Sequence, residues 1–350
     1  MAAANESHGL CMGSAMAHHD VIVIGASSGG VEALTTLLAL LPEDLAAAIF
    51  IVVHVRPDVP SYLPAILNRA GRLPVSHAVD GEPIRQRRIY VAPPGHQTYL
   101  KGSRIGVSRG PHENLHRPAI DPLFRTAAHH YGPRVIGIIL SGAMDDGSAG
   151  LRAVKQAGGV AIVQDPQDAA FPDMPANAMQ TADVDYVASV VDLAPLLVSL
   201  VRSGATATAL PLEVPLETQE EASRADEPLA SDELGPPSIF TCPDCSGTLF
   251  EISDGGAVRY RCRVGHAYSA EAMESAQNEA AERALWSALR ALEERIDLLR
   301  KMAQRAEDRG HQTVAAMFES RANDVNKDLD AIRNILISSP TLEPIVEAER

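Results

Sequence analysis

The chain has 350 residues, of which 46% are hydrophobic and 21% are charged, and its formal net charge at pH 7 is −15. This acidic balance argues against general affinity for nucleic acid or anionic membranes, and four cysteines are too few for a disulfide scaffold. We find no secretory signal in residues 1–20 and no apolar run of the roughly 18 residues needed to span a bilayer, so we expect a cytoplasmic protein without membrane insertion.

Apolar strands alternate with helical segments between residues 20 and 203. Continuous β-branched runs predict strands that are buried on both faces, which is typical of a parallel sheet. The expected strands are 21–24, 49–53, 88–92, 135–140 and 160–164, and the expected helices are 31–41, 61–70, 122–131 and 150–157. This alternation predicts a doubly wound, mostly parallel α/β sheet in a domain that spans residues 20–203.

Three of these strands lead to residue types that serve in catalysis. The first runs into Ser27, the second into His54, and the strand at 135–140 into a loop that contains Asp146. Because reactive residues gather outside the carboxyl ends of parallel strands, we expect all three at one edge of the sheet. A serine, a histidine and an aspartate together have the composition of an acyl-transfer site.

The glycine-rich turn at residues 25–30 fits two kinds of site. Its backbone N–H groups, among them those of Ser28 and Gly29, lie where a helix dipole favours an oxyanion beside a nucleophile. A phosphate or dinucleotide loop uses the same dipole, although the G-x-G-x-x-G spacing and the P-loop lysine are missing. Taken singly, His54 could be a residue at the core edge and Asp146 a turn residue. Their conjunction favours the catalytic interpretation.

Residues 23–34, with the sequence VIGASSGGVEAL, resemble the active-site segment of the CheB family of chemotaxis protein-glutamate methylesterases. Further segments of this chain resemble the same family in the same order: 91–96, 116–121, 140–147 and 164–175. The resemblance implies a Ser27–His54–Asp146 triad that needs no catalytic cofactor. It also implies methylated chemoreceptor-type proteins as substrates and deamidation of glutamines as a second reaction. Arg117 could steer an acidic substrate helix or serve as a structural ion-pair residue.

Members of this family commonly carry an N-terminal receiver domain that covers the active site. Here the catalytic segment begins within about twenty residues of Met1, so we expect no in-chain receiver. Another departure is Val55-Arg56-Pro57, which stands where the family usually has Met-Pro after the histidine. A non-catalytic signalling adaptor that keeps the esterase fold for binding is the alternative function.

The composition changes beyond residue 203. Residues 207–234 contain eight Asp or Glu residues against one Arg, which predicts a disordered acidic linker over 204–238. We also expect a flexible N-terminus at 1–19 and a flexible tail at 339–350.

A C-x2-C pair and a C-x3-H pair follow the linker, within an expected zinc-ribbon-like unit at residues 239–269. They are formed by Cys242, Cys245, Cys262 and His266, and the spacing predicts a tetrahedral structural Zn²⁺ site. The alternative is a reduced, metal-free hairpin. The nearby Arg259, Arg261 and Arg263 favour a solvated strand face over a nucleic-acid-binding ribbon.

Two helices with apolar stripes are expected in residues 270–338, with a break at Gly310. The stripes must find a partner, which could be the other helix, the zinc-ribbon-like unit or a second subunit. We expect this C-terminal module to dock a receptor, a signalling partner or a second subunit.

Overall fold

The structure, a computed structural model, describes residues 19–57, 59–203, 235–254 and 257–338. Our predictions for residues 1–18 of the N-terminus, for the acidic linker up to residue 234 and for the tail lie outside these residues. The described chain forms two compact units. The first contains residues 19–239 without the gaps just given, together with 247–269, and the second contains 240–246 and 270–338.

A seven-stranded sheet forms the centre of the first unit, with the strand order β3-β4-β2-β1-β7-β8-β9. All of its pairings are parallel, which confirms the predicted α/β fold class. Its strands are β1 (Val21–Ala26), β2 (Ala48–Val53), β3 (Val75–His77), β4 (Arg88–Val91), β7 (Val135–Ile139), β8 (Val160–Gln164) and β9 (Tyr186–Ala188). β1 lies between β2 and β7, so the three strands that lead to the predicted catalytic residues are neighbours.

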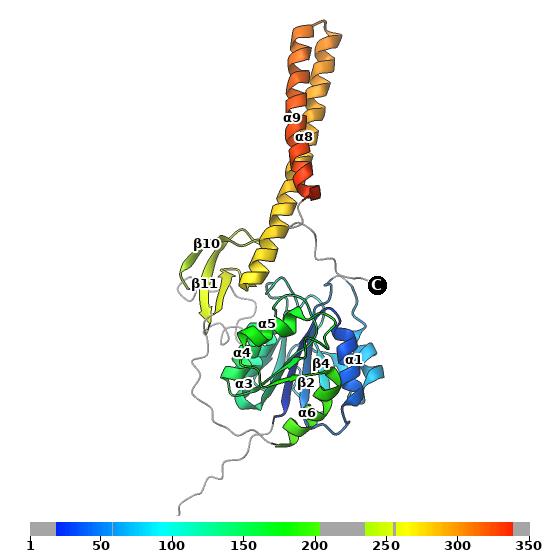
Figure 1. The fold of residues 1–350 in the computed structure, drawn as a ribbon, viewed down its shortest axis with the longest axis vertical. Helices are drawn as coiled ribbons and strands as arrows, with labels where there is room; N and C mark the ends of the chain where they lie inside the picture. The colour runs from blue at the N-terminus through cyan, green and yellow to red at the C-terminus, as the bar shows by residue number, and fades with distance from the viewer. Residues whose placement is uncertain (1–18, 58, 204–234, 255–256, 339–350) are drawn as a thin grey trace, which may run out of the picture. The chain divides into compact units, whose positions relative to one another are not determined.

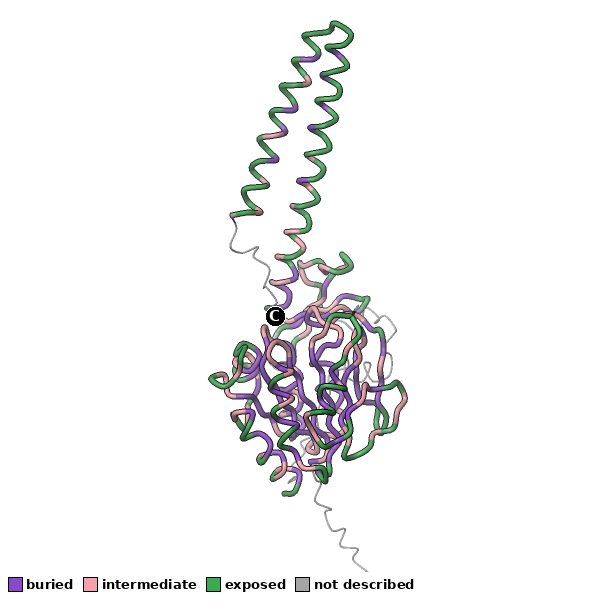
Figure 2. The backbone as a smooth tube through the Cα atoms, turned by 90° about the vertical axis from the view of Figure 1, so that its right-hand side faces the viewer, coloured by how far each residue is buried: buried purple, intermediate pink, exposed green. Residues whose placement is uncertain are grey.

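Helices cover both faces of this sheet (Figure 1). They are α1 (Gly30–Leu40), α2 (Leu63–Ala70), α3 (Ile120–Tyr131), α4 (Ser148–Gln156), α5 (Asp173–Thr181) and α6 (Val190–Ser203). Side chains alternate between the two faces along a strand. Ile22 and Ile24 of β1 therefore join the core under α1, α2 and α6, whereas Val21 and Val23 join the core under α3, α4 and α5. The central strands β1, β2 and β7 are buried along their whole length, and Figure 2 shows the buried backbone at the centre of this unit.

The core under α1 gives a matched pair of test positions on one helix. Leu37 is fully buried and Leu40 is 49% exposed. Since Leu37→Ala removes apolar contacts and leaves a cavity, we expect it to lower the free energy of unfolding by about 3 kcal/mol. Leu40→Ala should change it by less than about 0.5 kcal/mol. Urea unfolding of the full chain measures both, and equal effects would contradict this assignment of the core.

Smaller elements complete the fold. An antiparallel hairpin, which the sequence analysis did not predict, consists of β5 (Gln97–Lys101) and β6 (Arg104–Ser108). A second sheet of four strands has the order β10-β11-β12-β13. Its strands are β10 (Pro237–Thr241), β11 (Thr248–Asp254), β12 (Ala257–Cys262) and β13 (Ala267–Tyr268).

The second unit contains the expected helical hairpin, formed by α8 (Ala270–Asp308) and α9 (Gln312–Ser338). Gly310 lies between the helices at φ +76°, a left-handed conformation that glycine adopts easily. Leu289, Ile296 and Leu299 of α8 pack against Val325 and other residues of α9.

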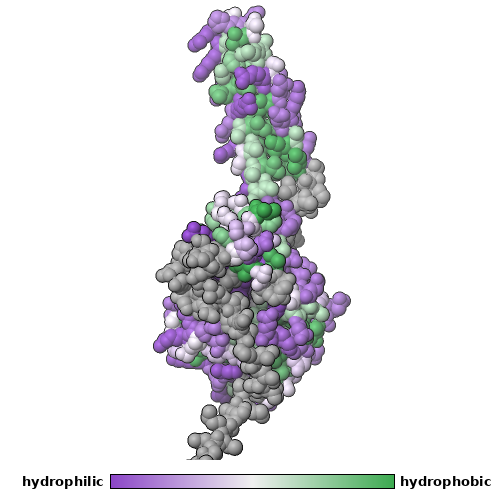
Figure 3. Space-filling model, turned by 90° about the vertical axis from the view of Figure 1, so that its left-hand side faces the viewer, coloured by the Kyte–Doolittle hydropathy of each residue, from purple (hydrophilic) through white to green (hydrophobic). Residues whose placement is uncertain are grey.

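Apolar side chains also remain on the surface of the hairpin (Figure 3), among them Trp286, Leu298 and Met317. Docking of a partner or a second subunit through these helices therefore stays a prediction. Of the helices in the described ranges, none is both long and apolar enough to cross a bilayer.

Candidate active site

The predicted catalytic residues meet at the carboxyl edge of the seven-stranded sheet. β1 and β2 end in register, with Ala26 opposite Val53, so the residues that follow them, Ser27 and His54, are adjacent. Asp146 arrives from the loop between β7 and α4. This loop is held to the turn after β1 by a hydrogen bond from the Ser27 N–H to the carbonyl of Ser141 (3.0 Å).

A chain of hydrogen bonds links the three side chains. His54 Nδ1 lies 3.1 Å from Ser27 Oγ, and His54 Nε2 lies 2.8 Å from the Asp146 carboxylate. Because a carboxylate only accepts, the Nε2 atom carries the proton and Nδ1 is left as a base facing the hydroxyl. The arrangement can therefore deprotonate Ser27 and stabilise the imidazolium that results.

Two glycines make room for this arrangement. Gly29 has φ +73°, and a Cβ there would lie 2.8 Å from both Ala170 Cβ and Ser141 Oγ. A Cβ on Gly142 would lie 2.0 Å from Met174 Sδ and 2.9 Å from Ser27 Cβ. The glycines therefore let the loop after β7 approach the nucleophile closely.

The Asp146 carboxylate is buried and held from several sides. It accepts hydrogen bonds from the Ile120 N–H (2.7 Å) at the start of α3 and from the side-chain amide of Asn114 (2.9 Å). Burial alone would raise the pKa of Asp146. The hydrogen bond from His54, the electrostatic interaction with His54 and the hydrogen bond from the Ile120 N–H outweigh that effect and lower this pKa to about 2. Asp146 is therefore ionised at neutral pH.

His116 stacks on His54, with 3.5 Å between ring centroids and 11° between ring planes. Burial, and then the neighbouring His54, lower the pKa of His116 to about 3. His116 is therefore neutral at pH 7 and fixes the plane of the His54 ring without adding charge. No role for His116 or Asn114 was predicted from the sequence. The only sequence signal was that His116 begins one of the segments with a family resemblance.

Buried charges lie next to Asp146. Burial and the neighbouring Asp146 raise the pKa of Asp121 to about 7. Arg125 makes two hydrogen bonds to Glu113, at 2.7 and 2.9 Å. The side chains of Asp121, Arg125 and Glu113 are each less than 10% exposed. Burial alone would raise the pKa of Glu113, but Arg125 and Arg259 together lower it.

A comparison with protein families identifies the family of this chain. Residues 22–197, just over half of the chain, match the family model described as CheB methylesterase. The chain belongs to the CheB methylesterase family. The match contains Ser27, His54 and Asp146, and ends before the cysteine pairs.

Individual relatives agree with this assignment to the CheB family. A protein of Leptospira interrogans is 38% identical over 184 residues, which are 52% of this chain and 95% of that protein. A protein of Anaeromyxobacter dehalogenans, named protein-glutamate methylesterase/protein-glutamine glutaminase 2, is 37% identical over 52% of this chain and 54% of its own length. The crystal structure of the Thermotoga maritima CheB methylesterase catalytic domain is 29% identical, with a TM-score of 0.50, and covers 52% of this chain and 98% of that one.

Three further residues named from the sequence, Ser28, Gly29 and Arg117, keep their roles as predictions. The N–H of Ser27 is engaged by Ser141, so Ser28 and Gly29, at the N-terminus of α1, stay our candidates for holding an oxyanion. The Arg117 guanidinium donates to the carbonyl of Gly110 (2.9 Å). A role of Arg117 in substrate binding therefore stays a prediction, while the structure gives it a role in holding its own loop.

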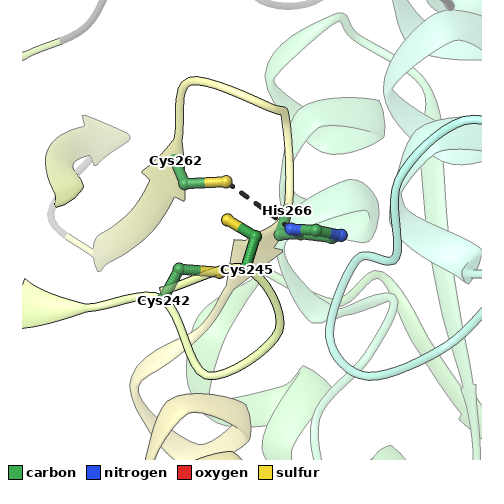
Figure 4. A group of neighbouring side chains, drawn as sticks. All are labelled: Cys242, Cys245, Cys262 and His266. Atoms are coloured by element: carbon green, nitrogen blue, oxygen red, sulfur yellow. Dashed lines mark hydrogen bonds between the residues drawn. The ribbon is translucent and has the colours of Figure 1, made fainter. Parts of the chain in front are cut away.

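The cysteine pairs come together as their spacing predicts (Figure 4). The ligand atoms of Cys242, Cys245, Cys262 and His266 all lie within 4.8 Å of one another. Cys262 Sγ is 3.6 Å from His266 Nδ1. Two ligands at about 2.3 Å (Zn–S) and 2.1 Å (Zn–N) with a tetrahedral angle at the metal would be about 3.6 Å apart. The donor set and this separation both fit Zn²⁺.

Proposed function

We propose that this CheB-family chain hydrolyses methyl esters of glutamyl side chains on chemoreceptor-type proteins in the cytoplasm. The observation that carries the proposal is the hydrogen-bonded chain Ser27–His54–Asp146 at the sheet edge, with 3.1 and 2.8 Å contacts. Membership of the family and the names of the relatives supply the substrate class.

The reaction would proceed through an acyl-enzyme. Ser27 Oγ attacks the ester carbonyl while His54 Nδ1 takes its proton, and Asp146 stabilises the imidazolium. The backbone N–H groups of Ser28 and Gly29 would hold the negative oxygen of the tetrahedral intermediate. The imidazolium returns the proton to the leaving methoxide, which departs as methanol. Water then attacks the acyl-enzyme with His54 again as base, which releases glutamate and restores Ser27.

Deamidation of glutamine would use the same residues. Attack of Ser27 on a side-chain amide forms the same glutamyl-enzyme and releases ammonia, and hydrolysis again yields glutamate. Arg117 could attract an acidic substrate helix to the site. Nothing in this chemistry requires a metal ion or an organic cofactor.

The decisive measurement is methanol release from a methylated chemoreceptor cytoplasmic fragment. We expect steady release by the full chain and a loss of at least ~10³-fold in Ser27→Ala, because the nucleophile is removed. Ser103→Ala, at an exposed turn between β5 and β6, is the matched control and should keep normal release. If Ser27→Ala turned over as fast as the unmodified chain, the proposal would be wrong. Binding of the fragment without any methanol release would favour the adaptor alternative.

We further propose that Cys242, Cys245, Cys262 and His266 hold one structural Zn²⁺. Four protein ligands leave no open position for a substrate, so the metal would stabilise the small sheet rather than catalyse a reaction.

Metal content tests this site directly. We expect one zinc per full-length chain by elemental analysis and a loss of most of it in Cys262→Ala, which removes a buried thiolate ligand. Cys11→Ala is the matched control and should retain the metal. A chain purified without zinc that also fails to bind added zinc would contradict the site.

A further inference from the structure

Asn114 connects the catalytic carboxylate to the cysteine-bearing part of the first unit. Its side chain is buried, with 2% exposure. The side-chain NH₂ donates to Asp146 (2.9 Å) and to Asp121 (3.0 Å), and the side-chain oxygen accepts the N–H of Ser269 (2.9 Å). One amide therefore contacts both carboxylates and a residue 155 positions further along the chain.

The backbone of Asn114 is held by the same segment. Residues 112–114 pair with Ala267 through two hydrogen bonds, from the Ala267 N–H to the carbonyl of His112 (3.2 Å) and from the Asn114 N–H to the carbonyl of Ala267 (2.8 Å). Asn114 has φ +48°, a left-handed conformation that few non-glycine residues adopt. Such conformations persist where the surroundings fix them, and they are frequent at functional sites.

Ser269 also contacts the residue next to the catalytic aspartate Asp146. Its hydroxyl donates to the carboxylate of Asp145 (2.9 Å), the residue just before Asp146. Ala267 and Ser269 thus contact the support of Asp146 and its chain neighbour. Both follow closely after Cys262 and His266, two of the proposed metal ligands.

We propose that Asn114 is a positioning residue for Asp146 and that Ala267 to Ser269 form a clasp that holds Asn114 in place. This inference rests on the proposed function, because it assumes that Asp146 orients His54. The Asn114 amide fixes one oxygen of Asp146, which leaves the other oxygen aligned with His54 Nε2. The same amide separates Asp146 from the neighbouring Asp121, whose carboxyl oxygen it also binds.

A substitution of Asn114 should therefore slow the chemistry without weakening substrate binding. For Asn114→Ala we expect kcat for methanol release to fall about 10- to 100-fold while KM changes less than about twofold. The rate at which a fluorophosphonate probe labels Ser27 should fall by a similar factor. Asn68→Ala is the matched control, because the two side-chain hydrogen bonds of Asn68 go to the backbone of Val75 and not to a residue of the triad. It should lower stability but leave kcat unchanged.

The clasp is tested by Ser269. Ser269→Ala removes the hydroxyl that binds Asp145, and we expect a three- to tenfold loss of kcat. Ser269→Thr keeps a hydroxyl and should restore most of the rate. A purely structural role would not produce this rescue in kcat at constant KM.

The outcomes separate this inference from the proposed function. Normal kcat and normal labelling in Asn114→Ala would overturn the positioning role and leave the esterase assignment intact. Equal rates in Ser269→Ala, Ser269→Thr and the unmodified chain would overturn the clasp. If the unmodified chain released no methanol and its Ser27 took up no probe, the proposed function would fail, and the inference with it.

Discussion

His54→Ala should reduce kcat for methanol release by about 10⁴-fold or more. The side chain contacts both the Ser27 hydroxyl and the Asp146 carboxylate, so its loss removes the base and separates the other two residues. Steady-state kinetics of the full chain on a methylated receptor fragment measure the loss. His130→Ala, at the exposed end of α3, is the matched control and should retain normal kcat.

The three residues should also behave as one unit. Adding Ser27→Ala to His54→Ala should cost little more than either change alone, because each single change already removes the nucleophilic pathway. Additive losses would mean that the two residues act in separate steps. Turnover within tenfold of normal in His54→Ala would contradict its role as the base.

The position of the site could be predicted because strand ends carry it. The runs that form β1 and β2 are entirely apolar, so their ends, and hence Ser27 and His54, were visible in the sequence. The position of Asp146 was harder to predict, since this residue lies in a loop that turns through Met144 at φ +65°. The end of the strand before that loop and the family resemblance pointed to it.

The support of the triad could not be predicted. His116 and Asn114 lie in a loop without apolar periodicity, whose shape depends on contacts such as those of the Gln97 side chain with the carbonyls of Pro111 (3.0 Å) and His116 (3.3 Å). The partner of Asn114, Ser269, is 155 residues away in the chain. Neither local propensity nor spacing gives a signal for contacts of this kind.

The burial of Arg259 was not predicted from the sequence, and the reason is instructive. The sequence analysis favoured a solvated strand face for it, which is wrong, because Arg259 is 3% exposed and its guanidinium binds Glu113. An arginine in a strand is most often at the surface, and only a buried acid from another segment makes burial tolerable. That acid is 146 residues earlier.

Glu113→Ala should lower the free energy of unfolding of the first unit by about 3–5 kcal/mol. Glu113 is the acid between two buried arginines, Arg125 from α3 and Arg259 from β12. Removing it leaves two positive charges in a site from which water is excluded. Urea unfolding of the full chain measures the loss. Glu32→Ala, at an exposed position of α1, is the control and should change stability by less than about 0.5 kcal/mol.

The isosteric change Glu113→Gln should separate charge from shape. Glutamine keeps the size of the side chain and one acceptor oxygen, so we expect its loss of stability to be real but smaller than that of alanine. If alanine cost less than about 1 kcal/mol, water or another acid must compensate the arginines. Since Arg259 belongs to the strand that precedes the clasp at Ala267 to Ser269, Glu113→Ala should also speed hydrogen exchange of the Ala267 and Asn114 amides. Unchanged exchange of these amides would mean that the clasp holds without the ion pairs of Glu113 with Arg125 and Arg259.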